Sequence, residues 1–143
     1  MSRLVGIDRL LGALCLLLLA GTAPAEVPHH KPDGSCIKDW LLVGPFFPDA
    51  LDRDFLAAVG GESKVSPREG DAVVAAGEQL AWKLCHSRSD VIDLNAWLGP
   101  RERATAYAFC LIESDHPTVG TLKLGSDDGA SVFLNGQRIL HQP

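Results

Sequence analysis

The stretch GSDDGASVFLNGQRIL, from Gly125 to Leu140, decides the fold class of this chain. Apolar and polar residues alternate over 130–134, which is typical of a strand with one buried face. Asn135-Gly136 follows directly and is a strong hairpin signal, because both central residues of a type I′ turn need a positive φ angle. The sequence therefore predicts a strand over 130–134, a tight turn and a returning strand over 138–141.

Short apolar runs elsewhere in the chain are also separated by turn residues. Gly44-Pro45, Gly60-Gly61 and Gly99-Pro100 interrupt them, and Pro45 lacks the amide donor that a central strand needs. Helical periodicity is scarce, so the pattern favours an all-β sandwich. The expected strands are 37–43, 80–86, 91–94, 104–112 and 121–126, with a short helix or a loop over 51–59 and a long surface connection over 60–77. A connection of that length often belongs to a binding face.

The N-terminus has the order of features found in a secretory signal peptide. Arg3 and Arg9 precede an apolar run over 10–20, and Ala23-Pro24-Ala25 supplies small residues for a cleavage site before Glu26. The apolar run is shorter than the roughly 20 residues of a membrane span. We therefore expect a secreted or periplasmic protein with a signal peptide over 1–25, a flexible leader over 26–36 with solvated His29 and His30, and one domain over 37–143.

The charge balance excludes one class of partner. The full chain has 13 basic and 18 acidic residues and a formal net charge of −5. Residues 26–143 keep 11 of the basic and 17 of the acidic residues, which gives −6. No basic cluster occurs there, so nucleic acid is not an expected partner. A second apolar span and a basic amphipathic helix are also missing from the sequence, so we expect no membrane association after signal cleavage.

Three cysteines remain after signal cleavage: Cys36, Cys85 and Cys110. An oxidising compartment would allow one disulfide and leave one thiol over, and the sequence does not choose among the three pairings. Cys110 lies in an apolar run and can equally be a small buried hydrophobic residue. The spacing of the three cysteines matches no zinc site.

Several stretches occur together in the order found in one family. They are DWLLVGPF at 39–46, LDRDFL at 51–56, GGES at 60–63, WK at 82–83, VIDL at 91–94, AYAFCLIES at 106–114 and LGSDDGASVFLNGQ at 124–137. The set resembles the galactose-binding-like, jelly-roll β-sandwich that occurs as an accessory domain in secreted bacterial proteins. The last stretch is similar to the Ser-Asp-Asp-Gly hairpin of PA14-type domains. The resemblance implies further strands after this hairpin, so we expect a domain that lacks its last strands, as a fragment of a longer protein would.

Asp127 and Asp128 have two interpretations. Aspartate carboxylates accept hydrogen bonds from amides two residues on, and Gly129 can supply a positive φ, so turn chemistry alone explains Ser-Asp-Asp-Gly between two strands. The resemblance implies a second role, because in some PA14-like lectins the matching aspartates bind Ca²⁺, which then binds sugar hydroxyls. Ca²⁺ takes roughly 6–8 oxygen ligands, so other loops would have to contribute. Calcium is thus the one cofactor that the resemblance implies.

Two aromatic residues are candidates for contact with a sugar. Phe133 lies on the strand face opposite to Val132 and would stack on a sugar ring if that face is open, although packing beneath a loop is the simpler explanation. Trp97 lies near the turn at 99–100 and is the tryptophan that we expect to be partly exposed. Trp40 and Trp82 lie within predicted strands and are expected in the core.

The sequence lacks the common catalytic motifs. It has no G-x-S-x-G elbow, no H-E-x-x-H and no glycine-rich phosphate loop. Cys85 and His86 are adjacent, and neighbours on a strand point to opposite faces, so they cannot form a nucleophile–base pair there. We therefore expect a non-enzymatic module, and the resemblance implies one that binds carbohydrate or a cell-surface glycan. The alternative is a structural accessory domain that packs against a neighbouring domain of a larger secreted peptidase or glycosidase.

Overall fold

The computed structural model describes residues 27–143, and the predicted signal peptide lies outside them. Nine strands, one five-residue α-helix and one three-residue 3₁₀ turn make up the regular structure of the described residues. The chain therefore has an all-β fold, as the sequence predicts. None of the described helices is both long and apolar enough to cross a bilayer.

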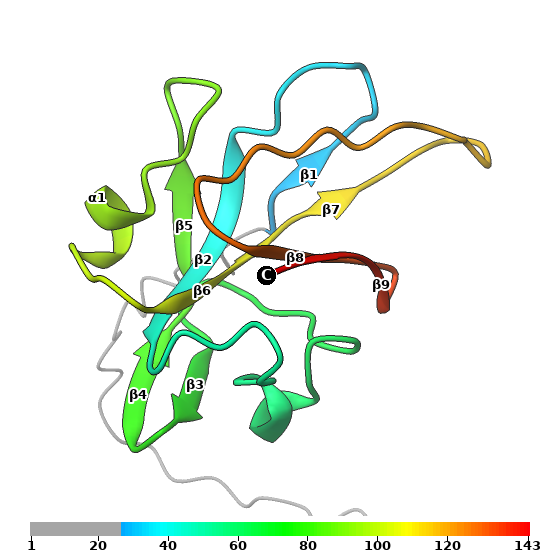
Figure 1. Cartoon of the computed structure of the whole chain (residues 1–143). Coiled ribbons are helices and arrows are strands. Elements are labelled where there is room, and N and C mark those ends of the chain that lie inside the picture. Colours follow the sequence, from blue (N-terminus) through cyan, green and yellow to red (C-terminus); the bar gives the residue numbers. More distant parts are fainter. Residues whose placement is uncertain (1–26) are drawn as a thin grey trace, which may run out of the picture.

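A three-stranded antiparallel sheet lies at the centre of the molecule (Figure 1). Its middle strand is β2 (Asp39–Phe46), which pairs with β5 (Lys83–His86) on one side and with β6 (Thr105–Phe109) on the other. Leu41, Leu42 and Val43 are almost completely buried, so both faces of β2 are covered. This explains why β2 is a continuous apolar run rather than an alternating one.

Three two-stranded ribbons surround this sheet. They are the hairpin of β3 (Ala72–Ala75) with β4 (Glu78–Ala81), the parallel pair of β1 (His29–His30) with β7 (Leu111–Ile112), and the hairpin of β8 (Ala130–Leu134) with β9 (Gln137–Gln142). In Figure 1 the helix α1 (Leu94–Leu98) lies to the left of the central sheet and the β8–β9 hairpin lies to its right. One sheet with three ribbons does not establish a jelly roll, so that finer assignment stays a prediction.

The core lies on one face of β2. Phe46 stacks on Phe55 with 5.2 Å between ring centroids, and Tyr107 meets Phe46 edge-on at 5.6 Å. Phe55 and Leu56 belong to the loop that carries the 3₁₀ turn η1 (Ala57–Val59), so their burial fixes this loop over the sheet. The buried cluster comprises Leu41, Val43, Phe46, Phe55, Leu56, Val73 and Trp82.

The structure confirms the predicted hairpin at 130–141. β8 and β9 pair in antiparallel register from Ala130↔Gln142 to Leu134↔Gln137, with a shift between Val132 and Phe133. Asn135 has φ 50° and Gly136 has φ 77°, as a turn of the predicted type requires.

Two predicted strand boundaries are wrong around β2 and β5. The strand expected over 37–43 continues to Phe46, because the register between β2 and β6 shifts between Val43 and Phe46 and the pairing passes over Pro45. The strand expected over 80–86 is divided at Trp82, whose amide donates to the carbonyl of Asp71 at 3.0 Å while its side chain is buried in the core. β4 on one side of Trp82 pairs with β3, and β5 on the other side pairs with β2.

Other segments also differ from the prediction. The connection over 60–77 contains β3, and the segment over 91–94 is not a strand, because the Asp93 side chain caps the N-terminus of α1 by accepting from the amides of Asn95 and Ala96. The strand over 104–112 breaks at Cys110 between β6 and β7, and residues 121–126 form no strand. The leader over 26–36 includes β1, whose pairing with β7 orders His29 and His30.

Candidate functional site

The β8–β9 hairpin is held at both of its ends by loops that follow β2. A Cβ atom added at Gly129 would lie 2.7 Å from Leu51 Cδ1 and 2.9 Å from the carbonyl oxygen of Gln142. A Cβ atom at Gly136 would clash with the carbonyl oxygen of Ser63. Close approach therefore favours glycine at both positions. As a result, the stretches LDRDFL, GGES and SDDG, which lie far apart in the sequence, converge on one side of the molecule.

Asp127 and Asp128 lie in an exposed bend immediately before β8. The sequence predicts that such carboxylates accept hydrogen bonds from amides two residues on, and Asp33, Asp54 and Asp93 do so at 2.8–3.0 Å. The described part of the chain holds no hydrogen bond of this kind for Asp127 or Asp128. The turn interpretation expected a positive φ at Gly129, but Gly129 does not have one. The close approach of Leu51 explains instead why a glycine occupies this position.

A chain of polar contacts runs from β8 to the loop beside Leu51. Ser131 Oγ lies 2.8 Å from His141 Nδ1, and His141 Nε2 lies 3.4 Å from a carboxylate oxygen of Asp52. Both ring nitrogens of His141 are therefore occupied. These contacts position the loop carboxylate of Asp52 on the same side as the bend at 127–128, because Leu51 also touches Gly129.

The calcium site at 127–128 stays a prediction. Asp127 and Asp128 are adjacent, exposed carboxylates, which suits a hard cation. Within residues 27–143, however, no three side chains of His, Cys, Asp or Glu come together in a way that could hold a metal ion. Carbonyl groups, water or sugar hydroxyls would have to supply the remaining ligands.

A network around Tyr107 was not found by sequence reasoning. The hydroxyl of Tyr107 donates to Glu62 Oε1 at 2.8 Å and accepts from the amide of Phe55 at 3.1 Å. Asp54 accepts from the amides of Leu56 at 2.9 Å and Glu62 at 3.2 Å. Tyr107 lies on β6, so one side chain ties both ends of the loop over 54–62 to the central sheet. The residues are 45 and more positions apart, so no local pattern could have revealed the pairing.

Burial governs the protonation of this network. It raises the pKa of Glu62, and the nearby charge of Asp54 acts in the same direction while the Tyr107 hydrogen bond acts against it. Burial also raises the pKa of Tyr107 well above its usual range. The tyrosine therefore keeps its proton and remains a donor to Glu62. Because these polar groups already bond one another, we assign them a role in holding the loop.

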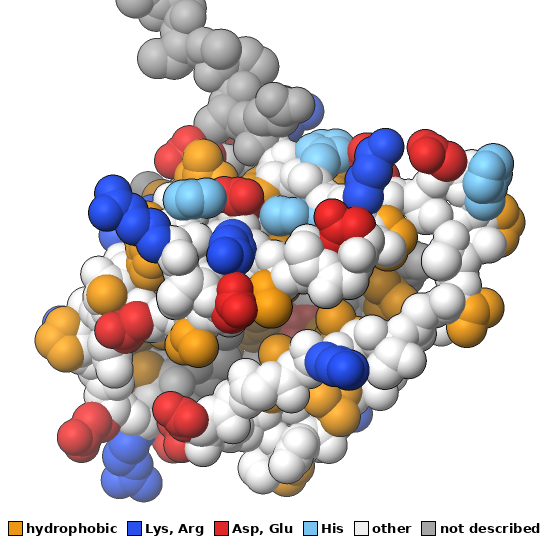
Figure 2. Space-filling model, turned by 90° about the horizontal axis from the view of Figure 1, so that it is seen from above, with side chains coloured by type: hydrophobic (Ala, Val, Ile, Leu, Met, Phe, Trp, Pro, Cys, Tyr) orange, Lys and Arg blue, Asp and Glu red, His pale blue; other side chains and the backbone are white. Residues whose placement is uncertain are grey.

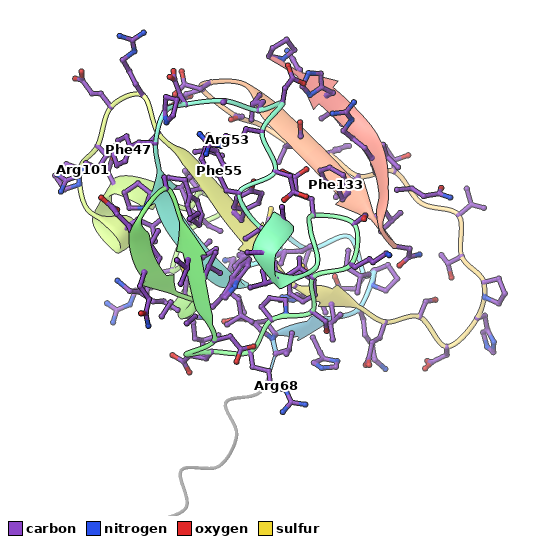
Figure 3. The ribbon with its side chains drawn as sticks, turned by 90° about the horizontal axis from the view of Figure 1, so that it is seen from below. Phe47, Arg53, Phe55, Arg68, Arg101 and Phe133 are labelled. Carbon is purple, nitrogen blue, oxygen red and sulfur yellow. The ribbon has the colours of Figure 1, made fainter. Side chains whose placement is uncertain are left out.

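The two aromatic candidates do not lie together. Phe133 is half-buried on β8, and Figure 3 shows it on the hairpin, on the side where Arg53 and Phe55 lie in the facing loop. The guanidinium of Arg53 covers the Phe55 ring at 4.8 Å, so that ring is not open to a ligand. Trp97 is 38% exposed but lies on α1, across the central sheet from the hairpin (Figure 1). Trp82 is buried as predicted, and Trp40 is half-buried.

All three cysteines of the described part are free thiols. Cys85 pairs with Trp40 on one side of β2, and Cys110 follows β6 on the other side. Two strand spacings separate their Cα atoms by about 9–10 Å, which exceeds the reach of a disulfide. Burial raises the pKa of Cys110 to about 11 and, with the charge of Asp39, also raises that of Cys85. Cys85 is buried and His86 is exposed, so the two point apart as predicted.

Two shallow cavities lie outside the hairpin region. One has a volume of about 250 Å³ and is lined mainly by apolar residues of the loop over 59–67 and of β3, with Trp82. The other, of about 340 Å³, lies between the start of the described chain and the central sheet, and its lining residues are Val27, Pro28, His29, Asp39 and Leu84. Neither cavity includes Asp127, Asp128, Phe133 or Trp97.

No family model, no curated protein and no solved structure matches this chain. The functional argument therefore depends on the chain's own residues and on the resemblance of its motifs.

Proposed function

We propose that this chain is a non-catalytic, exported binding module that recognises carbohydrate through the surface formed by the bend at 127–128 and the loop over 49–54. This surface is assembled from stretches that the resemblance identified together. The contacts of Gly129 with Leu51 and of His141 with Asp52 support the proposal, because they bring those stretches to one place.

One observation carries this proposal. Asp127 and Asp128 are exposed and unbonded, although other aspartates in the described chain serve their local turns. Carboxylates that a turn does not use remain available to a ligand. Sugar hydroxyls are good donors to carboxylates, and a bound Ca²⁺ would bridge the two carboxylates to sugar oxygens. Phe133, which is half-buried beside the loop, supports the surface from below rather than stacking on a sugar ring.

The test is a glycan array probed with the full chain in calcium buffer, in EDTA and after calcium is restored. We expect binding that EDTA removes and calcium restores. Replacing both aspartates, Asp127→Asn and Asp128→Asn, should reduce binding more than tenfold. The unfolding free energy should change by less than about 0.5 kcal/mol, because neither carboxylate makes a hydrogen bond to another described residue.

Asp115→Asn is the matched control, because Asp115 is an exposed aspartate that forms only a distant ion pair with Lys31 at 3.9 Å. It should leave binding unchanged. An array without signal in every buffer, or binding that the double variant retains, would contradict the proposal.

A structural accessory role is the second candidate, and exposed apolar side chains favour it. Leu134, Ile139 and Leu140 on the hairpin are 38–52% exposed, and Val119, Leu122 and Leu124 on the preceding segment are exposed as well. Apolar surface of this kind is typical of a contact with another protein surface. Hydroxyl-radical footprinting would detect it: oxidation of Leu134 and Ile139 should be lower in the native secreted material than in the isolated chain. Equal oxidation in both, together with glycan binding, would exclude this role.

A further inference from the structure

The polar side chains at the end of the molecule near β1 bond one another. His29 Nδ1 lies 2.9 Å from Glu113 Oε1, and His86 Nδ1 lies 2.5 Å from Asp39 Oδ1. Figure 2 shows histidine and acidic side chains interspersed over this face. Groups that already have partners have little to gain from a ligand, whereas a buried donor without a partner gains a hydrogen bond when a ligand binds.

Trp82, between β4 and β5, carries a donor of the second kind. The residue is 2% exposed. Its amide donates to the carbonyl of Asp71 at 3.0 Å, and its ring meets Phe109 edge-on at 6.5 Å between centroids, so both backbone and ring are fixed. No described residue accepts a hydrogen bond from Trp82 Nε1, whereas Trp40 Nε1 donates to the carbonyl of Ile37 at 3.0 Å.

This donor is not sealed inside the core. Among the described residues, no fully enclosed side-chain nitrogen or oxygen atom lacks a partner, so the unpartnered Trp82 Nε1 must reach accessible space. Trp82 lines the cavity of about 250 Å³ and does not line the cavity of about 340 Å³. We infer that the small accessible part of its side chain lies at the first cavity, where an occupant can accept from Nε1.

The size and walls of this cavity suit a single ring. Val73 and Pro67 are buried in its floor, and Val65 and Val59 are the other apolar lining residues besides Trp82 and Ala72. A cavity of about 150 Å³ in a protein interior accepts benzene, so the volume here allows one substituted ring.

The chemistry of the lining selects the class of ligand. An indole N–H is a donor only, so the ligand must supply an acceptor. Asp71 is also a lining residue and residues 26–143 carry a formal charge of −6, so an anionic acceptor is disfavoured. A sugar would bring several hydroxyl groups to mainly apolar walls, where each would need a partner. These constraints favour a neutral apolar ring with one acceptor oxygen.

We propose that this cavity binds a small, neutral, ring-containing molecule whose carbonyl or ether oxygen accepts a hydrogen bond from Trp82 Nε1. The fixed indole supplies the donor in advance, and the valine side chains contact the apolar body of the ligand. The cavity shares no residue with the surface formed by the bend at 127–128 and the loop over 49–54. Failure of one proposal therefore leaves the other intact.

A nuclear magnetic resonance titration of the full chain with acetophenone tests the site, and toluene is the matched ligand that lacks the acceptor. The sequence has three tryptophans, so three indole N–H signals are expected. Acetophenone should move the Trp82 signal downfield and shift the amide signals of residues 59, 65 and 73. The Trp40 signal should stay in place, because its donor is already bonded. Toluene should shift the same amides without moving the Trp82 signal downfield.

Trp82→Phe keeps an aromatic ring in the core and removes the donor. The variant assigns the indole signal and separates the hydrogen bond from the apolar contacts. In the parent chain, acetophenone should bind about two- to tenfold more tightly than toluene, which is the contribution of one neutral hydrogen bond. In Trp82→Phe the two ligands should bind equally. A loss of affinity that keeps the ratio between the ligands would show a purely structural role for Trp82 and contradict the proposal.

Val59→Asp tests the wall of the cavity. Val59 lines the cavity and is 41% exposed, so the variant places a carboxylate beside the ligand and should weaken both ligands by about threefold or more. Val74→Asp is the matched control, because Val74 on β3 is 58% exposed and does not line the cavity. It should leave both affinities unchanged.

The titration of the parent chain needs no substitution, so it remains decisive if a variant fails to fold. A Trp82 signal that does not move at the solubility limit of acetophenone would overturn the proposal. Shifts centred on residues 127–134 would overturn it as well, because they would place the ligand on the hairpin surface.

Discussion

The loop over 53–65 and the β8–β9 hairpin are attached to the molecule by different means. The loop inserts Phe55 and Leu56 into the core and is tied to β6 through Tyr107. The hairpin places two glycines against loop atoms and leaves Leu134, Ile139 and Leu140 exposed. Apolar burial and part-buried hydrogen bonds hold the first region. The second depends on the close approach of its glycines to the loops and on the polar contact between His141 and Asp52. The comparison teaches that the loop is the firmly packed support of the candidate surface, and that the hairpin is the part that can move relative to the core.

The largest expected effect is a difference in unfolding free energy between a variant of the loop and a variant of the hairpin, because their side chains differ in burial. Phe55→Ala removes a ring that is 3% exposed and stacks on Phe46, so it should lower the unfolding free energy by about 3–5 kcal/mol. Leu140→Ala, on a hairpin side chain that is 38% exposed, should cost less than about 0.5 kcal/mol. Urea denaturation followed by tryptophan fluorescence measures both. Equal losses would show that the hairpin is as firmly packed as the loop.

A smaller effect is expected when the tie between loop and sheet is cut. Tyr107→Phe keeps the ring against Phe46 but leaves the Phe55 amide and the Glu62 carboxylate without the hydroxyl. An unsatisfied buried group costs about 1–3 kcal/mol, so the variant should lose that amount of stability at neutral pH. Hydrogen exchange should become faster at the amides of residues 55 and 56 and stay unchanged in β8. Uniformly faster exchange would contradict the separation of the two regions.

The same tyrosine predicts a pH dependence. Burial raises its pKa in the folded state, so the folded chain keeps the proton at pH values where the unfolded chain loses it. The corresponding stability is fully present below about pH 10 and is lost as pH rises further. Tyr107 is the single tyrosine of the sequence, so absorbance at 295 nm reports it alone. Phenolate should appear at higher pH in the folded chain than in urea, and Tyr107→Phe should flatten the alkaline loss of stability.

The smallest expected effect concerns the attachment of the hairpin. Gly129→Ala introduces a methyl group against Leu51 and the carbonyl of Gln142, which should cost about 1 kcal/mol, at the low end for overpacking, because the hairpin can shift. Gly125→Ala is the control, because a Cβ atom there meets nothing within 4 Å. Hydrogen exchange at β8 and β9 should become faster only in the first variant. Identical exchange in both variants would contradict the role assigned to Gly129.

The sequence predicted the elements whose signals are local. The hairpin turn needs positive φ at Asn135 and Gly136, and that demand is visible in two residues. Segments whose structure depends on distant partners were predicted less well. Trp82 interrupts a strand because its amide bonds the carbonyl of Asp71 and its side chain packs in the core. Asp93 begins a helix because its carboxylate accepts hydrogen bonds from two following amides. The alternation over 121–126 is a strand pattern, yet no described strand pairs with it.

The candidate site was predicted in part. Asp127 and Asp128 are exposed, as a ligand site requires, but their calcium and sugar roles stay predictions. The contacts that assemble the surface could not be found from the sequence, because Leu51 meets Gly129 and Ser63 meets Gly136 only after the chain has folded. Trp97 was selected for its exposure, and exposure alone did not indicate which side of the sheet it occupies.

Residues 113–129 join β7 to β8 without any strand or helix of their own. The entropy of closing such a connection grows only with the logarithm of its length, so ten added residues would cost about 0.4 kcal/mol. The part of this stretch before Asp127 should therefore accept an inserted peptide or fluorophore tag. A reporter placed there would signal hairpin movement without disturbing the packed interior or the surface at 127–128.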